Sequence, residues 1–218
     1  MYGEESMMRE DHKNNINRRN YQKELEQIIA QNEKEGMVPS LFLHSCCAPC
    51  SSYVLEYLSN FFNITVYYYN PNIFPSKEYE ERAEEVERLV AELPAVHPIH
   101  FQSGVYNPTV FMDAVKGHES DPEGGARCEI CFKLRLRETA KLAALGGYDY
   151  FTTTLSISPL KDAQLLNTIG EEAGAEYGVH YLNSDFKKKN GYKRSIELSE
   201  AYQLYRQNYC GCIFSKRE

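Results

Sequence analysis

The sequence lacks the long apolar segments that membrane or exported proteins carry. No apolar run approaches the roughly 20 residues that a membrane-spanning helix requires, and the polar start "MYGEESMMREDHKNNINRR" has no apolar signal-peptide core. Internal repeats and low-complexity linkers are also absent. We therefore expect a cytosolic protein with no membrane partner.

Positive charge is also in short supply. The 24 Lys and Arg residues are outnumbered by 31 Asp and Glu, giving a formal net charge of -7, which argues against a nucleic-acid-binding surface over the whole protein. One local exception is the segment 187–218, which holds eight Lys or Arg against three Glu and begins with "KKKNGYKR". This segment is either a solvated basic turn or a basic binding face.

Strand and helix patterns alternate along the 218 residues. We expect an N-terminal arm and helix, possibly mobile, over 1–36 and one α/β domain over 37–218. The alternation predicts a parallel sheet of about five strands with helices on both faces. The predicted strands are 40–45, 64–70, 96–101, 148–155 and 179–183. The predicted helices are 21–36, 51–61, 76–93, 107–117, 128–145, 160–173 and 195–207.

Ligands of such sheets bind beyond the carboxyl ends of the strands. The segments "HSCCAPC" and "TTTLSISP" both fall at that edge. The hydroxyls of Ser156 and Ser158 could bind phosphate or ribose oxygens, but Ser and Thr in such places are as often helix caps.

The seven cysteines form three short motifs. In a reducing cytosol, such motifs favour metal binding or redox work over a structural disulfide framework. Cys128 and Cys131, in the first turn of a helix, offer half of a metal site. Cys46 and Cys47 could complete four thiolates for zinc or an iron-sulfur cluster, provided that the backbone turns at the strand end.

Two further cysteine pairs suggest redox chemistry. "CAPC", Cys47 to Cys50, is similar to a thioredoxin-type pair. A disulfide between Cys210 and Cys212 in "YCGC" would close a very small, strained and easily reduced ring. A thiolate metal site next to a reactive dithiol favours redox catalysis over a purely structural role.

From about residue 41 to 214 the chain resembles the QueH family of epoxyqueuosine reductases, which complete the modified nucleoside queuosine in tRNA. The segments that carry the resemblance are "HSCCAPCSSYVLEYL", "YYYNPNIFPSKEYEERAEEVERL", "CEICFKLRL", "TTTLSISPLKD", "DFKKKNGYKRSIELS" and "YRQNYCGCIFS". The first forty residues have no counterpart in the family pattern that we can place.

The resemblance implies a HUP-like (Rossmann-like) fold and a redox enzyme. It implies a four-iron four-sulfur (4Fe-4S) cluster on Cys46, Cys47, Cys128 and Cys131, a redox-active disulfide between Cys210 and Cys212, and a second metal, an iron, beside the cluster. Cys50 is our candidate ligand for that second metal. ATP is not expected to be used, because "HSCCAPCSS" replaces the glycine-rich phosphate loop of related HUP-like enzymes.

The reaction implied is the reduction of an epoxide to an alkene, which consumes two electrons and two protons from an unidentified electron donor. An acidic protein that acts on tRNA needs a place that tolerates phosphates. The expected backbone contacts are Lys187, Lys188, Lys189, Lys193 and Arg194.

Several aromatic and polar residues have two interpretations. Tyr67, Tyr68 and Tyr69 could stack on an extruded base, although an aromatic strand in the core is the simpler interpretation. His44 and Asp185 are either proton donors or structural residues. A thiol-disulfide oxidoreductase and a zinc-stabilised RNA-binding module remain the competing classes of protein.

Overall fold

A five-stranded parallel sheet forms the centre of the structure. The computed structural model describes residues 19–216, so most of the predicted N-terminal arm, residues 1–18, lies outside the described residues. The strand order is β3-β2-β1-β4-β5, and every neighbouring pair is parallel. This confirms the predicted α/β fold with five parallel strands. The strands are β1 (Ser40–Ser45), β2 (Asn63–Tyr68), β3 (Ile99–Ser103), β4 (Tyr150–Thr153) and β5 (His180–Tyr181).

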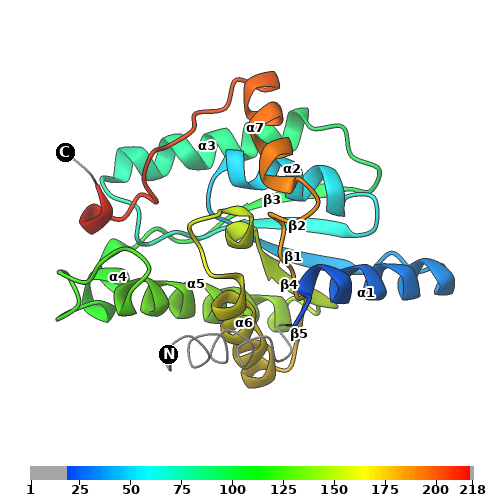
Figure 1. The fold of residues 1–218 in the computed structure, drawn as a ribbon, viewed down its shortest axis with the longest axis horizontal. Helices are drawn as coiled ribbons and strands as arrows, with labels where there is room; N and C mark the ends of the chain where they lie inside the picture. Colours follow the sequence, from blue (N-terminus) through cyan, green and yellow to red (C-terminus); the bar gives the residue numbers. More distant parts are fainter. Residues whose placement is uncertain (1–18, 217–218) are drawn as a thin grey trace, which may run out of the picture.

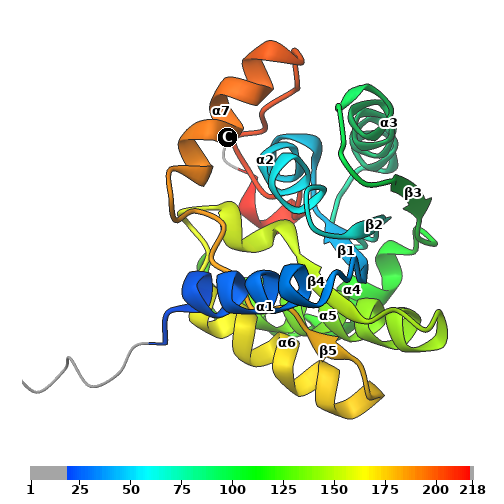
Figure 2. The ribbon, with the colours of Figure 1, turned by 90° about the vertical axis from the view of Figure 1, so that its right-hand side faces the viewer.

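Helices cover both faces of this sheet. Helices α2, α3 and α7 lie on one side and α5 and α6 on the other, as Figures 1 and 2 show. The helices are α1 (Tyr21–Glu35), α2 (Ala48–Leu58), α3 (Ser76–Glu92), α4 (Pro108–Ala114), α5 (Ala126–Leu145), α6 (Ala163–Tyr177) and α7 (Gly191–Ala201). Two short 3₁₀ turns, η2 (Thr154–Ile157) and η3 (Ile213–Ser215), follow β4 and precede the C-terminus.

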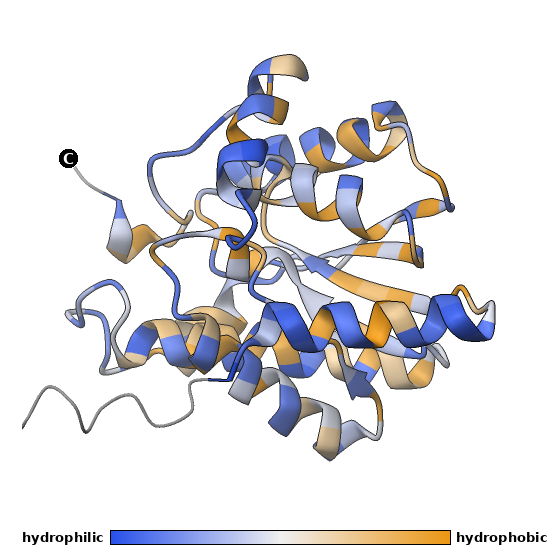
Figure 3. Ribbon diagram, turned by 45° about the vertical axis from the view of Figure 1, so that its right-hand side comes forward, coloured by the Kyte–Doolittle hydropathy of each residue, from blue (hydrophilic) through white to orange (hydrophobic). Residues whose placement is uncertain are grey.

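The apolar strand β1 supplies both layers of the core. Successive strand side chains point to opposite faces, so Leu41 and Leu43 pack beneath α2 and α3 while Phe42 packs towards α5. Burying each such side chain contributes roughly 1.5–3 kcal/mol. The outer helices carry hydrophilic and hydrophobic residues along the same ribbon, as amphipathic helices do (Figure 3).

Helix α1 packs into the same core as α2 and α3. Its Leu25 and Ile29 are buried in the cluster that contains Leu41 and Leu55. The side chain of Asn20 caps the start of the helix by accepting a hydrogen bond from the backbone of Lys23, and Gly36 ends the helix in the left-handed conformation. The helix predicted over 21–36 is therefore confirmed, and the domain boundary at residue 36 stays a prediction.

The strand order reverses between β1 and β4. The chain proceeds from β1 to β2 and β3 on one side, and β4 and β5 lie on the other. Ligands of open α/β sheets bind at such a switch point, outside the carboxyl ends of the strands. Among the described helices, none is both long and apolar enough to cross a membrane.

Several predicted helix boundaries were wrong by three or more residues, among them those of α6, which covers Ala163–Tyr177 rather than 160–173. The helix after β1 begins at Ala48 rather than residue 51, so Cys50 lies in its first turn. The last helix covers Gly191–Ala201 rather than 195–207. It ends because Gln203 adopts a left-handed φ of 51° and the Leu204 amide bonds back to the Ser199 carbonyl at 2.7 Å, although the apolar periodicity continues beyond this point.

Candidate active site

Three cysteine sulfurs meet at the carboxyl end of β1. The sulfurs of Cys46, Cys47 and Cys50 all lie within 4.8 Å of one another, and the Cys46 and Cys47 sulfurs are 3.8 Å apart. Cys47 is the extended N-cap of α2, with φ of -172°, and Pro49 lies in the first turn. The backbone turn that two adjacent cysteines require is therefore present.

The three thiols of this group share negative charge unequally. Hydrogen bonds from Cys47 and Cys50 hold the pKa of Cys46 well below its usual value. The same contact with Cys46 raises the pKa of Cys50 to about 12, and that of Cys47 is raised too. One thiolate stabilised by two thiols is thus the favoured state of the group.

All seven cysteines line two adjoining cavities. The first, of about 340 Å³, is lined by Cys46, Cys47, Cys50 and Cys210. The second, of about 110 Å³, is lined by Cys128, Cys131, Cys210 and Cys212. Small-molecule sites span roughly 300–1,000 Å³. The first cavity therefore falls in the range for an organic substrate, whereas the second is smaller than such a site.

The start of α5 presents the predicted cysteine pair to the second cavity. The Gly124 N–H donates to the Cys128 sulfur at 3.2 Å. Burial raises the pKa of Cys131 to about 11. Cys46 and Cys128 pack against one apolar cluster formed by Phe132, Leu155 and their neighbours, but within residues 19–216 the only sulfurs that lie close enough together to hold one ion are those of Cys46, Cys47 and Cys50.

Two cations face these sulfurs from the cavity walls. Arg135, which is 4% exposed, and Lys161 line both cavities. Within residues 19–216 neither forms an ion pair with a carboxylate. Although burial opposes it, the negative charge of Cys46, Cys50 and Cys210 raises the pKa of Lys161. Arg135 is buried and Lys161 is half-buried, so both positive charges are stabilised by anions nearby.

The thiol set and these cations fit a thiolate-bound metal group. Tetrahedral thiolate sites with metal–sulfur distances of about 2.3 Å place sulfurs roughly 3.8 Å apart, which is the separation between Cys46 and Cys47. Arg135 and Lys161 would offset the surplus negative charge of several thiolates. The one such group among the described residues contains Cys50 in addition to Cys46 and Cys47, so the structure offers three sulfur ligands to a single ion, and Cys128 and Cys131 lie outside this group.

The C-terminal segment 205–216 carries the last cysteine pair across the cavities. Cys212 forms an isolated antiparallel bridge with Ile73, and the Phe74 amide donates to the Gly211 carbonyl at 3.0 Å. Gly211 has a φ of 93°, and a Cβ there would lie 2.8 Å from the Ile73 side chain. Only glycine fits between the two cysteines without strain.

All seven cysteines are free thiols in the structure. A hydrogen bond from Cys212 lowers the pKa of Cys210 well below its usual value, while the pKa of Cys212 is raised. The pair therefore contains one nucleophilic sulfur and one protonated sulfur, as dithiol chemistry requires.

The predicted hydroxyl and basic residues divide into two groups. Ser158 lines the first cavity, whereas the buried Ser156 hydroxyl contacts Ser184 at 3.2 Å and accepts from the Phe186 amide. Lys187, Lys188 and Lys189 line a third hollow beside the first cavity. Lys193 and Arg194 lie on α7 outside these hollows, and Arg194 pairs with Glu56 and Glu197.

The structural interpretation fits His44, Tyr67, Tyr68 and Asp185, whereas Tyr69 is only half-buried. His44 is buried between the Thr153 hydroxyl at 2.9 Å and the Tyr69 carbonyl at 3.1 Å. Because a carbonyl only accepts, the ring proton lies on Nε2, and Nδ1 accepts from Thr153. Tyr67 and Tyr68 are buried in the core, and Asp185 pairs with Lys187.

Arg135 and Lys161 are the cavity residues that sequence reasoning missed. Arg135 lies in "FKLRL" and Lys161 in "SPLKD", where each looks like an ordinary solvated cation. The one available signal was that "SPLKD" follows the hydroxyl-rich end of β4, at the ligand edge of the sheet.

Fold and site together define a Rossmann-like protein with a thiol-rich, cation-lined site at the switch point of its sheet. The profile of the family described as "Epoxyqueuosine reductase QueH" matches residues 41–218. The chain belongs to this family, which confirms the resemblance found in the sequence.

Several bacterial proteins named epoxyqueuosine reductase QueH are similar over most of their length. The Streptococcus pyogenes serotype M1 protein is 45% identical over 200 residues, which cover 91% of this chain and 78% of the relative. The Staphylococcus epidermidis protein is 46% identical, with 90% and 84% covered. The Thermotoga maritima protein is 34% identical, with 82% and 91% covered. The similarity thus extends well beyond the cysteine motifs.

Proposed function

We propose that this protein reduces epoxyqueuosine to queuosine in tRNA, the last step of queuosine biosynthesis. The observation that carries the proposal is the convergence of seven free cysteines from three distant segments on two adjoining cavities lined by Arg135 and Lys161. Family membership supplies the substrate, because the relatives are named for this reaction.

The proposed metal ligands are the thiols that surround the cavities. Cys46, Cys47, Cys128 and Cys131 would hold a 4Fe-4S cluster, and Cys50 would contribute to a second metal, an iron. Such a cluster would supply electrons one at a time. Arg135 and Lys161 hold fixed positive charge beside the thiolates.

The proposed catalytic pair is Cys210 and Cys212. Conversion of the epoxide to the alkene needs two electrons and two protons and releases the epoxide oxygen as water. Oxidation of the Cys210 and Cys212 thiols to a disulfide releases two electrons and two protons, so one dithiol balances one substrate. An external electron donor then has to reduce the disulfide.

The proposed substrate contacts surround the first cavity. Ser158 lies on its wall, and the basic segment that begins at Lys187 lies beside it. We also assign backbone contacts to Lys188, Lys189, Lys193 and Arg194, and a supporting position to Ser156 beneath the wall. The cytosol, where tRNA is modified, is the proposed location.

The proposal is tested by anaerobic purification followed by an activity assay. We expect a brown protein that contains iron and sulfide and converts tRNA bearing epoxyqueuosine to tRNA bearing queuosine when a low-potential electron donor is added. A colourless protein that exchanges disulfides, or one that holds a single zinc ion and leaves the epoxide intact, would refute the proposal.

A further inference from the structure

A third hollow lies between the start of α1 and the basic segment after β5. Its volume is about 880 Å³, larger than either cysteine cavity, and it is open to solvent. Its floor includes the buried Tyr21 and Gln22. One wall is the first turn of α1 and the other is the segment 185–189.

The charge of this groove is opposite to that of the whole chain. Its lining carries six cations and three carboxylates, within a protein whose formal net charge is -7. The cations are Arg19, Lys23, Lys161, Lys187, Lys188 and Lys189, and the carboxylates are Glu26, Asp162 and Asp185. A concentrated positive groove on an acidic protein attracts polyanions, while the acidic surface elsewhere repels them.

Not every cation in the groove is available to a ligand. Lys187 pairs with Asp185 at 2.8 Å and Lys189 pairs with Glu26. Within residues 19–216, Lys23 and Lys188 form no ion pair, and both are exposed. These two residues lie on opposite walls of the groove, on different elements, so they are the exposed groups free to bind an anion. Lys161, which also forms no ion pair with a described carboxylate, is half-buried beside the cysteine sulfurs.

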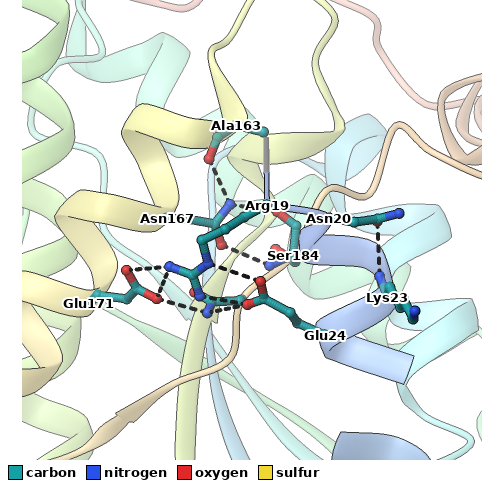
Figure 4. Close-up of polar contacts among 9 residues, drawn as sticks. Arg19, Asn20, Lys23, Glu24, Ala163, Asn167, Glu171 and Ser184 are labelled. Carbon is teal, nitrogen blue, oxygen red and sulfur yellow. Dashed lines mark hydrogen bonds and ion pairs between the residues drawn. The ribbon is translucent and has the colours of Figure 1, made fainter. Parts of the chain in front are cut away.

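Arg19 anchors the α1 wall instead of binding a ligand. Its guanidinium contacts Glu24 at 2.6 Å and Glu171 of α6 at 2.8 Å, and Asn183 donates to both carboxylates. Figure 4 shows this network joining α1 and α6. Asn167 of α6 continues it, since its amide donates to the Ser184 carbonyl at 2.9 Å. The position of α1 relative to the basic segment is therefore fixed.

The groove is continuous with the cysteine site. Lys161 lines the groove and both cysteine cavities. Lys187 donates to the Ser156 carbonyl at 3.3 Å and to the Lys161 carbonyl at 3.5 Å, which ties the basic segment to the loop after β4. A chain of negative charges lying in the groove would therefore reach the mouth of the first cavity.

We infer that this groove binds the phosphodiester backbone next to the reacting nucleoside, and that the first turn of α1 is part of the RNA-binding surface. The inference rests on the proposed function for the identity of the RNA. It adds a binding residue, Lys23, from the part of the chain that precedes the family match at residue 41. Single-stranded loops bind in positively charged grooves of this kind, with bases turned into adjacent pockets.

Charge reversal at the two free lysines tests the groove. Binding of tRNA bearing epoxyqueuosine is measured over a range of salt concentrations for the parent protein and for Lys23→Glu and Lys188→Glu. We expect each variant to bind about tenfold more weakly at low salt. The slope of log affinity against log salt should fall by about one for each phosphate that the variant no longer neutralises.

Lys34→Glu is the matched control. Lys34 lies in the last turn of the same helix, exposed and away from the groove, and its reversal changes the net charge equally. We expect less than a twofold change in affinity. Equal thermal unfolding midpoints of the three variants and the parent would exclude misfolding.

The outcomes separate the groove from the proposed reaction. Parent-like affinity and salt slope in both groove variants, or an equal loss of affinity in Lys34→Glu, would refute the inference that the groove binds RNA. If the parent protein binds the tRNA through Lys23 and Lys188 but leaves the epoxide intact, the proposed reaction is refuted and the inference of RNA binding in the groove is supported. No tRNA binding by the parent protein would overturn both.

Discussion

The cysteines after β1 and those near the C-terminus are held in opposite ways. Cys46 and Cys47 lie between a central strand and a helix, and Cys50 lies in the first turn of that helix. Ser45 beside them bonds to Ser51 at 2.7 Å. Cys210 and Cys212 lie on a segment without regular secondary structure except the short turn η3.

This difference in fixation fits the two tasks proposed for these groups. A metal site needs its ligands positioned in advance, and the junction of a strand and a helix provides this. A dithiol has to change its sulfur–sulfur distance as it oxidises. The C-terminal segment, held by the bridge between Ile73 and Cys212 and by the contact of Arg82 with the Tyr209 ring, leaves room for that movement. The following four predictions sharpen or break this comparison.

The largest effect is expected from Cys47→Ser. Loss of a thiolate from the fixed group should abolish metal binding and lower reductase activity by at least about a hundredfold, since even changes behind the ligands typically cost 10–100-fold. Metal content, sulfide content and turnover on epoxyqueuosine tRNA are measured together. Full metal content in this variant would contradict the ligand assignment.

The second effect is expected from Cys212→Ser. Turnover should fall by about tenfold or more, because Cys210 can no longer form a disulfide, while iron content and cluster absorbance stay at the parent level. Loss of the cluster in this variant would show that the two cysteine groups do not divide the work.

The third effect is a loss of stability in acid caused by His44. Burial lowers the pKa of His44 from 6.5 to about 3. Below pH 6.5 the unfolded chain binds a proton that the folded protein does not, so this contribution is present above pH 6.5 and decreases as the pH falls towards 3.

The expected loss is roughly 2–3 kcal/mol between pH 7.5 and 4.5, at about 1.4 kcal/mol per pH unit. Urea unfolding of the parent protein and of His44→Gln at both pH values measures it. The variant should be less stable at pH 7.5 and should lack this share of the pH dependence. Identical pH dependence in both proteins would mean that His44 binds its proton in the folded protein as readily as in the unfolded chain.

The smallest effect is expected from Arg82→Met, which loosens the C-terminal segment. Arg82 is 2% exposed, pairs with Glu78 at 2.6 Å and lies 5.3 Å from the Tyr209 ring centroid. Losing a charge-assisted hydrogen bond of this kind costs about 2 kcal/mol.

Arg88→Met on the same helix is the control for Arg82→Met. Arg88 pairs with Glu92 at 2.9 Å, but its side chain is 41% exposed, so its loss should cost less than about 1 kcal/mol. Chemical denaturation compares the two variants. An equal loss of unfolding free energy in both variants would show that Arg82 does not specifically stabilise the C-terminal segment.

The sequence predicted the fold class well because short apolar runs identify the strands of a parallel sheet. "SLFLHS" matches β1 residue for residue, since a short run buried on both faces is typical of a central strand. The backbone turn that Cys46 and Cys47 need in order to meet is also present, whereas their role as metal ligands stays a prediction.

The rest of the site depends on tertiary contacts that have no local pattern. Cys50 joined the first group because α2 begins three residues earlier than its apolar periodicity suggests. The roles of Arg135 and Lys161 depend on burial among sulfurs from other segments. The end of α7 depends on a left-handed residue, Gln203, which no local rule predicts.

Lys161 has a consequence for how this protein can be dissected. Its side chain is the one lining residue common to the groove and both cysteine cavities within residues 19–216. A substitution there would change the charge of the proposed RNA-binding groove and the charge beside the thiols at once. Separation-of-function variants therefore have to be sought on either side of position 161, at Lys23 and Lys188 for affinity and at Cys212 for turnover.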